Sequence, residues 1–510
     1  MLADGRREGS DPAMARGGTA CAHNGNGAAG PSGRREATSS RVGDSWDAVA
    51  SSLILSDWAA HVATIWWTRS GGPASIEATC QARLRALVDF ARTHSEVYRE
   101  AYRDVPDSFV LRQLPVMNRR TLMNRFDDWV TDREITRVDV GAFLADRGHI
   151  GLRYLGRYIV WTSSGTSDEP GIYLQDADAV ATYDALIASQ LISSSLFARC
   201  AWGSLSRGGR AALIAATGDH FASIASWERV CRANPWLAAR GFSVMQPIAE
   251  LVAGLNDYQP AFVASYPTML LLLAEEIRSG RLKIKPAILW SGGEHLPVAA
   301  QQELERAFGC PVVNEYGASE CLSIAFGCSG GWLHVNADWV VVEAVDSAYE
   351  PVAPGEASAT VLVTNLANRV QPILRYDLGD SIVVKPEPCS CGSPLPAIRV
   401  QGRCDALLSL HDPRGKPVGL LPLALTTVVE EVLQAHPFQI VQTGSAELTV
   451  RIAIGRGSAR QAAWHAVEQA LRGYLLRQSL PNVQLVLDPH GPAVDPRTGK
   501  LRHVVVAPSV

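Results

Sequence analysis

The chain of 510 residues lacks several features that define other classes of protein. No apolar run reaches about 18 residues, which argues against a membrane-spanning helix. The formal net charge is only −4, so nothing indicates a surface for nucleic acid or anionic membranes. The first residues have no basic start followed by an apolar segment, and we do not expect a secretory signal. These absences favour a cytoplasmic protein that binds neither nucleic acid nor membrane.

A dense cysteine pattern is also missing, although the chain has ten cysteines. In a large cytosolic protein such scattered cysteines are expected to be free thiols or metal ligands rather than disulfides. Hydrophobic residues make up 47% of the chain and charged residues 19%, which is typical of a globular enzyme. The length predicts two or more domains.

The sequence divides into three regions. Residues 1–44 are rich in Gly, Ala, Ser and Arg and lack apolar periodicity, so we expect a disordered tail. Residues 45–403 are expected to form a large domain that begins with helices, because apolar residues recur at helical spacing up to about residue 103. Beyond this point short apolar runs, which predict buried strands at 211–216 and 287–290, alternate with helical stretches. This alternation predicts layered α/β structure. Residues 404–510 are expected to form a small α/β domain with helices at 423–435 and 459–476.

Short motifs follow one another along the chain, and each alone would be a weak signal. They read WTSSGTSDEP at 161–170, SGGE at 291–294, NEYGASE at 314–320, RYDLGD at 375–380, GRCD at 402–405 and DPRTGKLR at 495–502. In this order they resemble the adenylate-forming superfamily of acyl-CoA ligases, adenylation domains and luciferases. The chain looks most like the branch of phenylacetate-CoA ligases and coenzyme F390 synthetases. This resemblance implies a large AMP-binding domain and a small mobile C-terminal lid domain.

The first motif is suited to phosphate binding. Backbone N–H groups and hydroxyls in a Ser/Gly-rich turn can hold phosphate oxygens, and no Gly-Lys-Ser/Thr follows that would make it a Walker A loop. Asp168 stands where the family usually has glycine, and a carboxylate near phosphates is unfavourable. The resemblance implies that these residues bind ATP: Ser163, Ser164, Gly165, Thr166 and Ser167 in the first motif, and Gly292, Gly293, Glu294, Glu315, Tyr316, Gly317, Asp380 and Arg403 further along.

Other roles also come from the resemblance. Tyr316 would stack on adenine, Asp380 would accept hydrogen bonds from the ribose hydroxyls, and Glu320 would hold Mg²⁺, which prefers such oxygen ligands. The predicted catalytic residues are Lys500, Glu320 and Thr166, with Lys500 acting as a point charge near the reacting groups. Asp405 is the expected hinge, although Ala406 stands where many relatives carry a second Asp. His220 is a candidate residue of the carboxylate pocket.

Cysteines and one histidine suggest a second site. Cys389 and Cys391 form a short Cys-x-Cys turn, and Cys328 and His334 lie about sixty residues earlier. Two thiolates from one turn and a Cys/His pair from another give the four ligands of a closed structural zinc site. Cys321 is an alternative to His334, and two unrelated thiol turns are the competing interpretation.

The expected reaction joins a carboxylic acid, which we expect to be aromatic, to the AMP of ATP and then passes the acyl group to coenzyme A. The partners are therefore a small acid, ATP and CoA. Three alternatives stay open: AMP transfer to a hydroxyl substrate, amide formation or loading of a carrier protein, and a degenerate protein that only binds nucleotide. The sequence leaves the oligomeric state open, with a homodimer as one option.

Overall fold

The structure is a computed structural model that describes residues 58–163, 171–192, 208–234, 237–400, 408–420, 422–433, 436–454, 457–493 and 503–507. All of these residues belong to one compact unit, Leu55–Val510. None of the helices in these ranges is long and apolar enough to cross a bilayer.

Helices open the described part of the chain, as the apolar spacing predicts. After a helix at 58–70, α2 (Gly72–His94) buries one stripe of side chains at helical spacing, among them Leu84, Leu87 and Ala91. The following short helices are α3 (Glu96–Ala101), α4 (Arg119–Asn124), α5 (Phe126–Trp129) and α6 (Arg137–Leu144), with 3₁₀ turns η1 (Leu111–Gln113) and η2 (Arg147–His149). The Asn118 side chain caps α4 by accepting from the Thr121 N–H, and Thr136 caps α6 in the same way.

A mixed sheet forms the centre of the structure. Within the described residues its strand order is β14-β15-β10-β9-β8-β7-β6-β4-β5. The strands β4 to β8 pair in parallel, and β8, β9, β10, β15 and β14 pair antiparallel. Their bounds are β4 (Ala211–Ala215), β5 (Ala239–Ser243), β6 (Phe262–Ser265), β7 (Ile288–Ser291), β8 (Val312–Tyr316), β9 (Ala325–Gly327), β10 (Leu333–Val335), β14 (Ile382–Val384) and β15 (Ala397–Val400).

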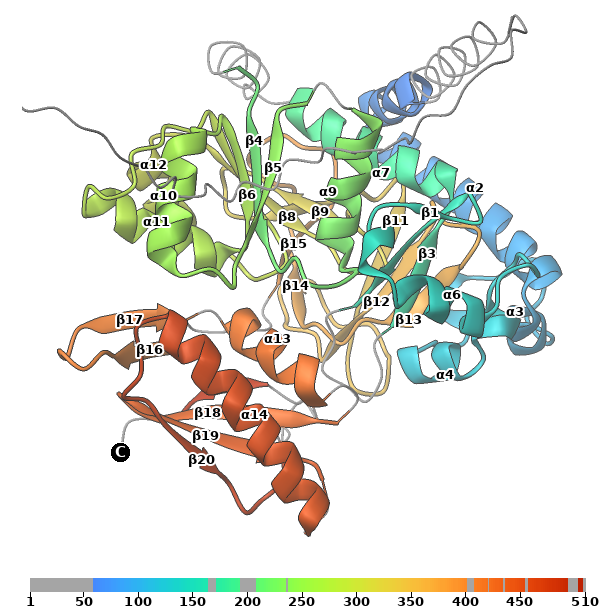
Figure 1. Ribbon diagram of the computed structural model, residues 1–510. Helices are drawn as coiled ribbons and strands as arrows, with labels where there is room; N and C mark the ends of the chain where they lie inside the picture. Colours follow the sequence, from blue (N-terminus) through green and yellow to red (C-terminus); the bar gives the residue numbers. More distant parts are fainter. Residues whose placement is uncertain are drawn as a thin grey trace, which may run out of the picture. The chain divides into compact units, whose positions relative to one another are not determined.

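Helices cover both faces of the parallel strands (Figure 1). Successive residues of β4 point to opposite faces, so Ala212 and Ile214 belong to one core cluster while Leu213 and Ala215 belong to another. The first cluster contains side chains of α10 (Ile248–Tyr258), α11 (Pro267–Arg278) and α12 (Val298–Phe308). The second contains side chains of α7 (Ala177–Ile192) and α9 (Ala222–Ala233). Burial on both faces explains why β4, β6 and β7 are almost continuously apolar.

Two smaller antiparallel sheets lie in the same part of the chain. One contains β1 (Arg153–Tyr154), β2 (Tyr158–Thr162) and β3 (Ile172–Gln175), and the other contains β11 (Val340–Val345), β12 (Thr360–Asn365) and β13 (Ile373–Asp377). Buried polar side chains join them: the Gln371 carbonyl accepts from the Leu174 N–H, and the Asn368 amide donates to the Leu174 carbonyl. The strand after the first motif is therefore fixed to the segment before β13.

The C-terminal residues form their own sheets. The hairpin β16 (Leu408–His411) and β17 (Pro417–Leu420) is followed by a sheet with the order β20-β19-β18-β21. Its strands are β18 (Phe438–Gly444), β19 (Glu447–Ile452), β20 (Gln484–Leu487) and β21 (Val504–Val506), and its helices are α13 (Pro422–Leu433) and α14 (Ser458–Arg477). Alternate residues of β19 are buried, as expected of a sheet with helices on one face.

The predicted α/β fold class is confirmed, and so are individual elements. The apolar runs predicted as strands at 211–216 and 287–290 correspond to β4 and β7. The predicted helices at 423–435 and 459–476 correspond to α13 and α14, with ends shifted by a few residues. The boundary between the large and the small domain near residue 403 stays a prediction.

Candidate functional site

Most of the predicted nucleotide-binding residues in the described part lie at the end of a parallel strand or directly after it. Gly292, Gly293 and Glu294 come directly after β7, and Gly317 comes directly after β8. Because β4, β6, β7 and β8 run in parallel, their carboxyl ends meet at one edge of the sheet. This edge is where open α/β sheets bind ligands. The sheet thus gathers segments that are distant in sequence.

Several predicted residues lie outside the described residues. They are Ser164, Gly165, Thr166, Ser167 and Asp168 of the first motif, Arg403 and Asp405 of the hinge motif, and Lys500. Ser163 is described and closes the base of the first loop: its N–H donates to the Gly171 carbonyl, and its hydroxyl oxygen accepts from the Gly171 N–H, each over 2.9 Å.

The third and fourth motifs meet through one hydrogen bond. Tyr316 ends β8, and its hydroxyl donates to Asp380 Oδ2 over 3.0 Å. Asp380 follows β13, where Gly379 adopts a φ of +80° and donates its N–H to Asp377 Oδ1 and Thr360 Oγ1. A positive φ favours glycine. The residues predicted to contact adenine and ribose are therefore neighbours.

Gly317 starts a tight turn that only glycine can form. A Cβ at this position would lie 1.8 Å from the Leu322 carbonyl oxygen. The turn is closed by hydrogen bonds in both directions between the backbones of Ala318 and Cys321. It directs the chain from Tyr316 to Glu320, so the two predicted ligand-binding side chains have a fixed separation.

Glu320 is almost completely buried, with 9% of its surface exposed. Its Oε1 accepts hydrogen bonds from the Tyr173 hydroxyl over 2.7 Å and the Tyr376 hydroxyl over 2.8 Å. Burial and the neighbouring carboxylate raise the pKa of Tyr173 and of Tyr376 well above its usual value, so both phenols stay protonated and can donate. Neither tyrosine was identified from the sequence, because a tyrosine on an apolar strand looks like ordinary core.

Glu315 makes hydrogen bonds away from the strand end. Its Oε2 accepts from the indole N–H of Trp290 over 2.7 Å, and its Oε1 accepts from the Ser323 hydroxyl over 2.8 Å. Burial raises the pKa of Glu315 to about 7, although the two hydrogen bonds act in the opposite direction. The carboxyl group thus has protein partners, and a part for Glu315 in nucleotide binding stays a prediction.

The SGGE segment is held by the neighbouring helix. The Glu294 carboxylate accepts from the Thr268 N–H over 3.1 Å and from the Thr268 hydroxyl over 2.7 Å, at the start of α11. Gly293 has a φ of +81°, and a Cβ there would lie 3.0 Å from the Tyr266 ring. Glu294 therefore anchors the turn, while the glycines keep the backbone at the strand end free of side chains.

His220 is completely buried after β4. Its Nε2 lies 3.2 Å from the Asp146 carbonyl, so this nitrogen carries the proton, and Nδ1 has no hydrogen-bond partner among the described residues. Desolvation lowers the pKa of His220 and favours the neutral ring. A buried acceptor without a partner is unusual and is compatible with the predicted place of His220 in a substrate pocket.

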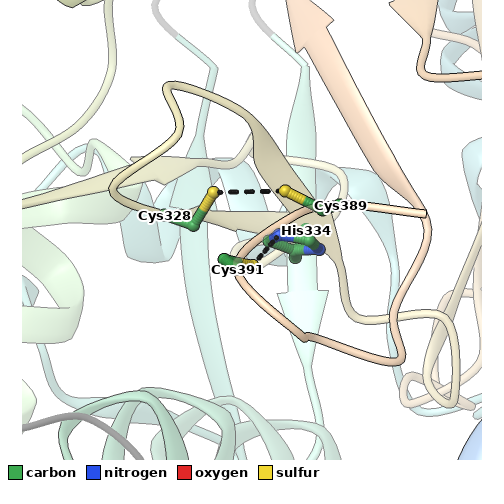
Figure 2. Close-up of side chains that lie close together, drawn as sticks. All are labelled: Cys328, His334, Cys389 and Cys391. Carbon is green, nitrogen blue, oxygen red and sulfur yellow. Dashed lines mark hydrogen bonds between the residues drawn. The ribbon is translucent and has the colours of Figure 1, made fainter. Parts of the chain in front are cut away.

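Four predicted metal ligands come together (Figure 2). Cys328 follows β9, His334 lies in β10, and Cys389 and Cys391 lie between β14 and β15. Their ligand atoms all lie within 4.8 Å of one another. The sulfurs of Cys328 and Cys389 are 3.8 Å apart, and the Cys391 sulfur lies 3.1 Å from His334 Nε2. Cys321 does not belong to this group. Of the two alternatives for the fourth ligand, His334 is therefore the one that lies beside the three cysteines.

The surroundings of the cluster suit a metal. The Nδ1–H of His334 donates to the Leu395 carbonyl over 3.0 Å, which directs Nε2 to the thiols. Burial lowers the pKa of His334 and so favours the neutral ring that a metal requires. Arg399 and Lys385 lie over the Trp332 ring beside the cluster, at 4.0 and 5.4 Å from its centre. Their positive charge favours thiolates nearby.

Comparisons with known proteins agree with the motifs. The model of the AMP-binding enzyme family matches residues 228–356. Phenylacetate-coenzyme A ligase of Thermus thermophilus is 27% identical over 279 residues, which are 49% of this chain and 61% of the relative. Protein CapK of Staphylococcus aureus is 28% identical over 138 residues, which are 26% of this chain and 28% of that protein. The chain thus spans less than two thirds of the length of these curated relatives.

The crystal structure of 2-hydroxyisobutyryl-CoA ligase with 2-HIB-AMP and CoA aligns with 84% of this chain and 89% of that chain. The TM-score is 0.50 at 20% identity, which shows a shared fold. The family match over residues 228–356 and the shared fold agree with the resemblance of the motifs to the adenylate-forming superfamily. The phenylacetate-coenzyme A ligase of Thermus thermophilus is a relative of the kind that the motifs predict.

Proposed function

We propose that this protein activates a carboxylic acid with ATP and transfers the acyl group to coenzyme A. The observation that carries the proposal is the hydrogen bond of 3.0 Å between Tyr316 and Asp380. These residues come from two motifs that are 64 residues apart, and they meet beside the carboxyl ends of β7 and β8. An aromatic side chain beside a carboxylate can bind the base and the ribose of one nucleoside.

The first half-reaction forms an acyl-adenylate. A carboxylate oxygen of the substrate attacks the α-phosphorus of ATP, the bond to the bridging oxygen breaks, and pyrophosphate leaves. Ser163 to Ser167 hold the phosphates, Tyr316 and Gly292 to Glu294 border the adenine, and Asp380 and Arg403 bind the ribose side. Lys500 contributes a positive charge between the acid and the α-phosphate, where negative charge develops.

The carboxylate of Glu320 is a suitable ligand for Mg²⁺. A carboxylate oxygen is the type of ligand this ion prefers, and Glu320 Oε2 makes no hydrogen bond with the described residues, whereas Oε1 has two. Glu320 would hold the ion beside the phosphates. When bound, Mg²⁺ neutralises charge on the phosphate oxygens.

The second half-reaction transfers the acyl group. The sulfur of CoA attacks the acyl carbon, the bond between that carbon and the phosphate oxygen breaks, and AMP leaves. We propose that residues 404–510 turn about Asp405 between the half-reactions, so that Lys500 is withdrawn before the thiol arrives. The Thermus relative is a phenylacetate-coenzyme A ligase, which supports an aromatic acid and CoA as the substrates of this protein.

We propose a structural zinc ion at Cys328, His334, Cys389 and Cys391. Tetrahedral zinc with Zn–S bonds of about 2.3 Å has sulfurs about 3.8 Å apart, and the sulfurs of Cys328 and Cys389 are separated by 3.8 Å. Four protein ligands leave no position for substrate, so the ion would stabilise the fold. It would join the β9–β10 turn to the segment between β14 and β15.

The proposed activity can be tested by trapping the intermediate. The protein is incubated with MgATP, hydroxylamine and a panel of aromatic and aliphatic acids, with one sample that lacks acid. Acid-dependent hydroxamate supports adenylate formation, and a CoA thioester formed without hydroxylamine supports CoA as the acceptor. Hydroxamate without thioester points to an amine or a carrier protein. ATP binding without hydroxamate for any acid contradicts the proposal and favours AMP transfer to a hydroxyl or a protein that only binds nucleotide.

A further inference from the structure

Three oxygen atoms form a buried triangle at the Glu320 carboxylate. The hydroxyls of Tyr173 and Tyr376 lie 2.7 and 2.8 Å from Glu320 Oε1, and 3.1 Å from each other. Both tyrosines are almost completely buried. A phenol hydroxyl has a single proton. The two hydroxyls therefore have two protons for three contacts. Each hydroxyl donates its proton to the carboxylate, because these two contacts are the shorter ones.

The triangle joins two motifs to the strand that follows the first motif. Tyr173 lies on β3, the strand after the first motif, and Tyr376 lies on β13 inside the RYDLGD motif. Glu320 ends the NEYGASE motif. Sequence separations of 147 and 56 residues are thus bridged at one carboxylate oxygen.

The backbone beside Glu320 is also fixed. The indole N–H of Trp161 donates to the Ser319 carbonyl over 2.8 Å, and the Asn365 amide donates to the Glu320 carbonyl over 3.1 Å. The main chain therefore has its own anchors on β2 and β12. Loss of one tyrosine hydroxyl would leave Oε1 with one hydrogen bond, and loss of both would free the carboxylate, while these anchors still hold the loop.

We propose that Tyr173 and Tyr376 are positioning residues that commit Oε1 of Glu320 to the protein and leave Oε2 as the oxygen that binds a divalent cation with ATP. This inference rests on the proposed function, in which Glu320 holds the cation. A carboxylate that cannot rotate binds the cation through one oxygen only. It also loses less entropy on binding than a carboxylate that rotates freely. Hydrogen-bonded partners of metal ligands tune metal affinity in this way.

The test measures cation-dependent ATP binding without turnover. The full-length protein and the variants Tyr173→Phe, Tyr376→Phe and the double variant are titrated with ATP by calorimetry over a range of Mg²⁺ or Mn²⁺ concentrations. Tyr98→Phe is the matched control, because this buried hydroxyl donates to the Pro372 carbonyl over 2.9 Å and does not contact Glu320. Glu320→Gln is the reference for loss of the ligand.

We expect the cation concentration at half-saturation to rise about tenfold to a hundredfold in the tyrosine variants. ATP binding without cation should stay unchanged, and Tyr98→Phe should match the wild type. Thermal melting identifies variants that do not fold, and each single variant tests the inference independently of the other.

The binding data distinguish failure of the inference from failure of the proposed function. If Glu320→Gln weakens cation-dependent binding but the folded tyrosine variants behave like the wild type, the inference is overturned and the proposed role of Glu320 survives. If Glu320→Gln has no effect on cation-dependent binding, or the wild type shows none, both are overturned. If Tyr98→Phe shifts the half-saturation as much as the other variants, the effect is general to core tyrosines and the inference is overturned.

Discussion

Glu315→Gln should change how the stability of the protein depends on pH. The carboxyl group of Glu315 accepts hydrogen bonds from Trp290 and Ser323, and burial raises its pKa from 4.5 to about 7. A glutamine can keep both contacts, because its carbonyl oxygen accepts from the indole and its amide can donate to a reoriented Ser323 hydroxyl. The substitution therefore removes the titration with little change in shape.

The sign and the size follow from proton linkage. Between pH 4.5 and about 7 the folded protein binds more protons at Glu315 than the unfolded chain, so this group lowers the free energy of unfolding as the pH rises through that window. Above about pH 7 its contribution is constant. A shift of this size corresponds to about 3 kcal/mol as an upper limit, since the residue keeps partial contact with solvent.

Urea unfolding followed by tryptophan fluorescence measures this effect at a series of pH values. The difference in unfolding free energy between Glu315→Gln and the wild type should grow in favour of the variant from pH 4.5 to about 7 and then level off. Glu356→Gln is the control, because Glu356 is exposed. Parallel curves for wild type and Glu315→Gln would refute a raised pKa at this position.

Three further outcomes are expected. The purified protein should contain about one zinc per chain, and chelation or Cys391→Ser should lower its melting temperature; metal loss without a change in melting would contradict a structural ion. Lys500→Ala should abolish hydroxamate formation while ATP still binds in calorimetry, and full activity would exclude the proposed role. Glu343→Gln should lower the urea-derived unfolding free energy by about 3 kcal/mol, because Arg375, which is 5% exposed, loses its ion pair of 3.0 Å. An unchanged free energy would show that the carbonyl groups that accept from Arg375 are enough to stabilise its charge.

Much of the architecture can be predicted because burial leaves a direct trace in the sequence. The parallel strands β4 and β7 are covered on both faces, so their sequences are continuous apolar runs. Helices α13 and α14 are long enough for periodicity to identify them. The order of strands in the sheet has no comparable local signal, because pairing between β10 and β15 joins residues more than sixty positions apart.

The candidate site, too, can be predicted from the sequence only in part. The Cys-x-Cys turn and the Cys/His pair predict the cluster, because both are short patterns of ligand side chains. The Tyr173 and Tyr376 contacts with Glu320 could not be predicted, since nothing local tells a tyrosine with a carboxylate partner from a core tyrosine. In the structure, Tyr173, Leu174 and Gln175 of β3 are all buried. Polar groups in a fully buried strand need partners.

ATP–pyrophosphate exchange measures directly whether this protein forms an acyl-adenylate. Labelled pyrophosphate, MgATP and a panel of aromatic and aliphatic acids are incubated with the protein, with a sample that lacks acid and with Lys500→Ala as controls. We expect label in ATP only when an acid is present, with the strongest exchange for an aromatic acid and none for Lys500→Ala. ATP binding without exchange for any acid would contradict this expectation.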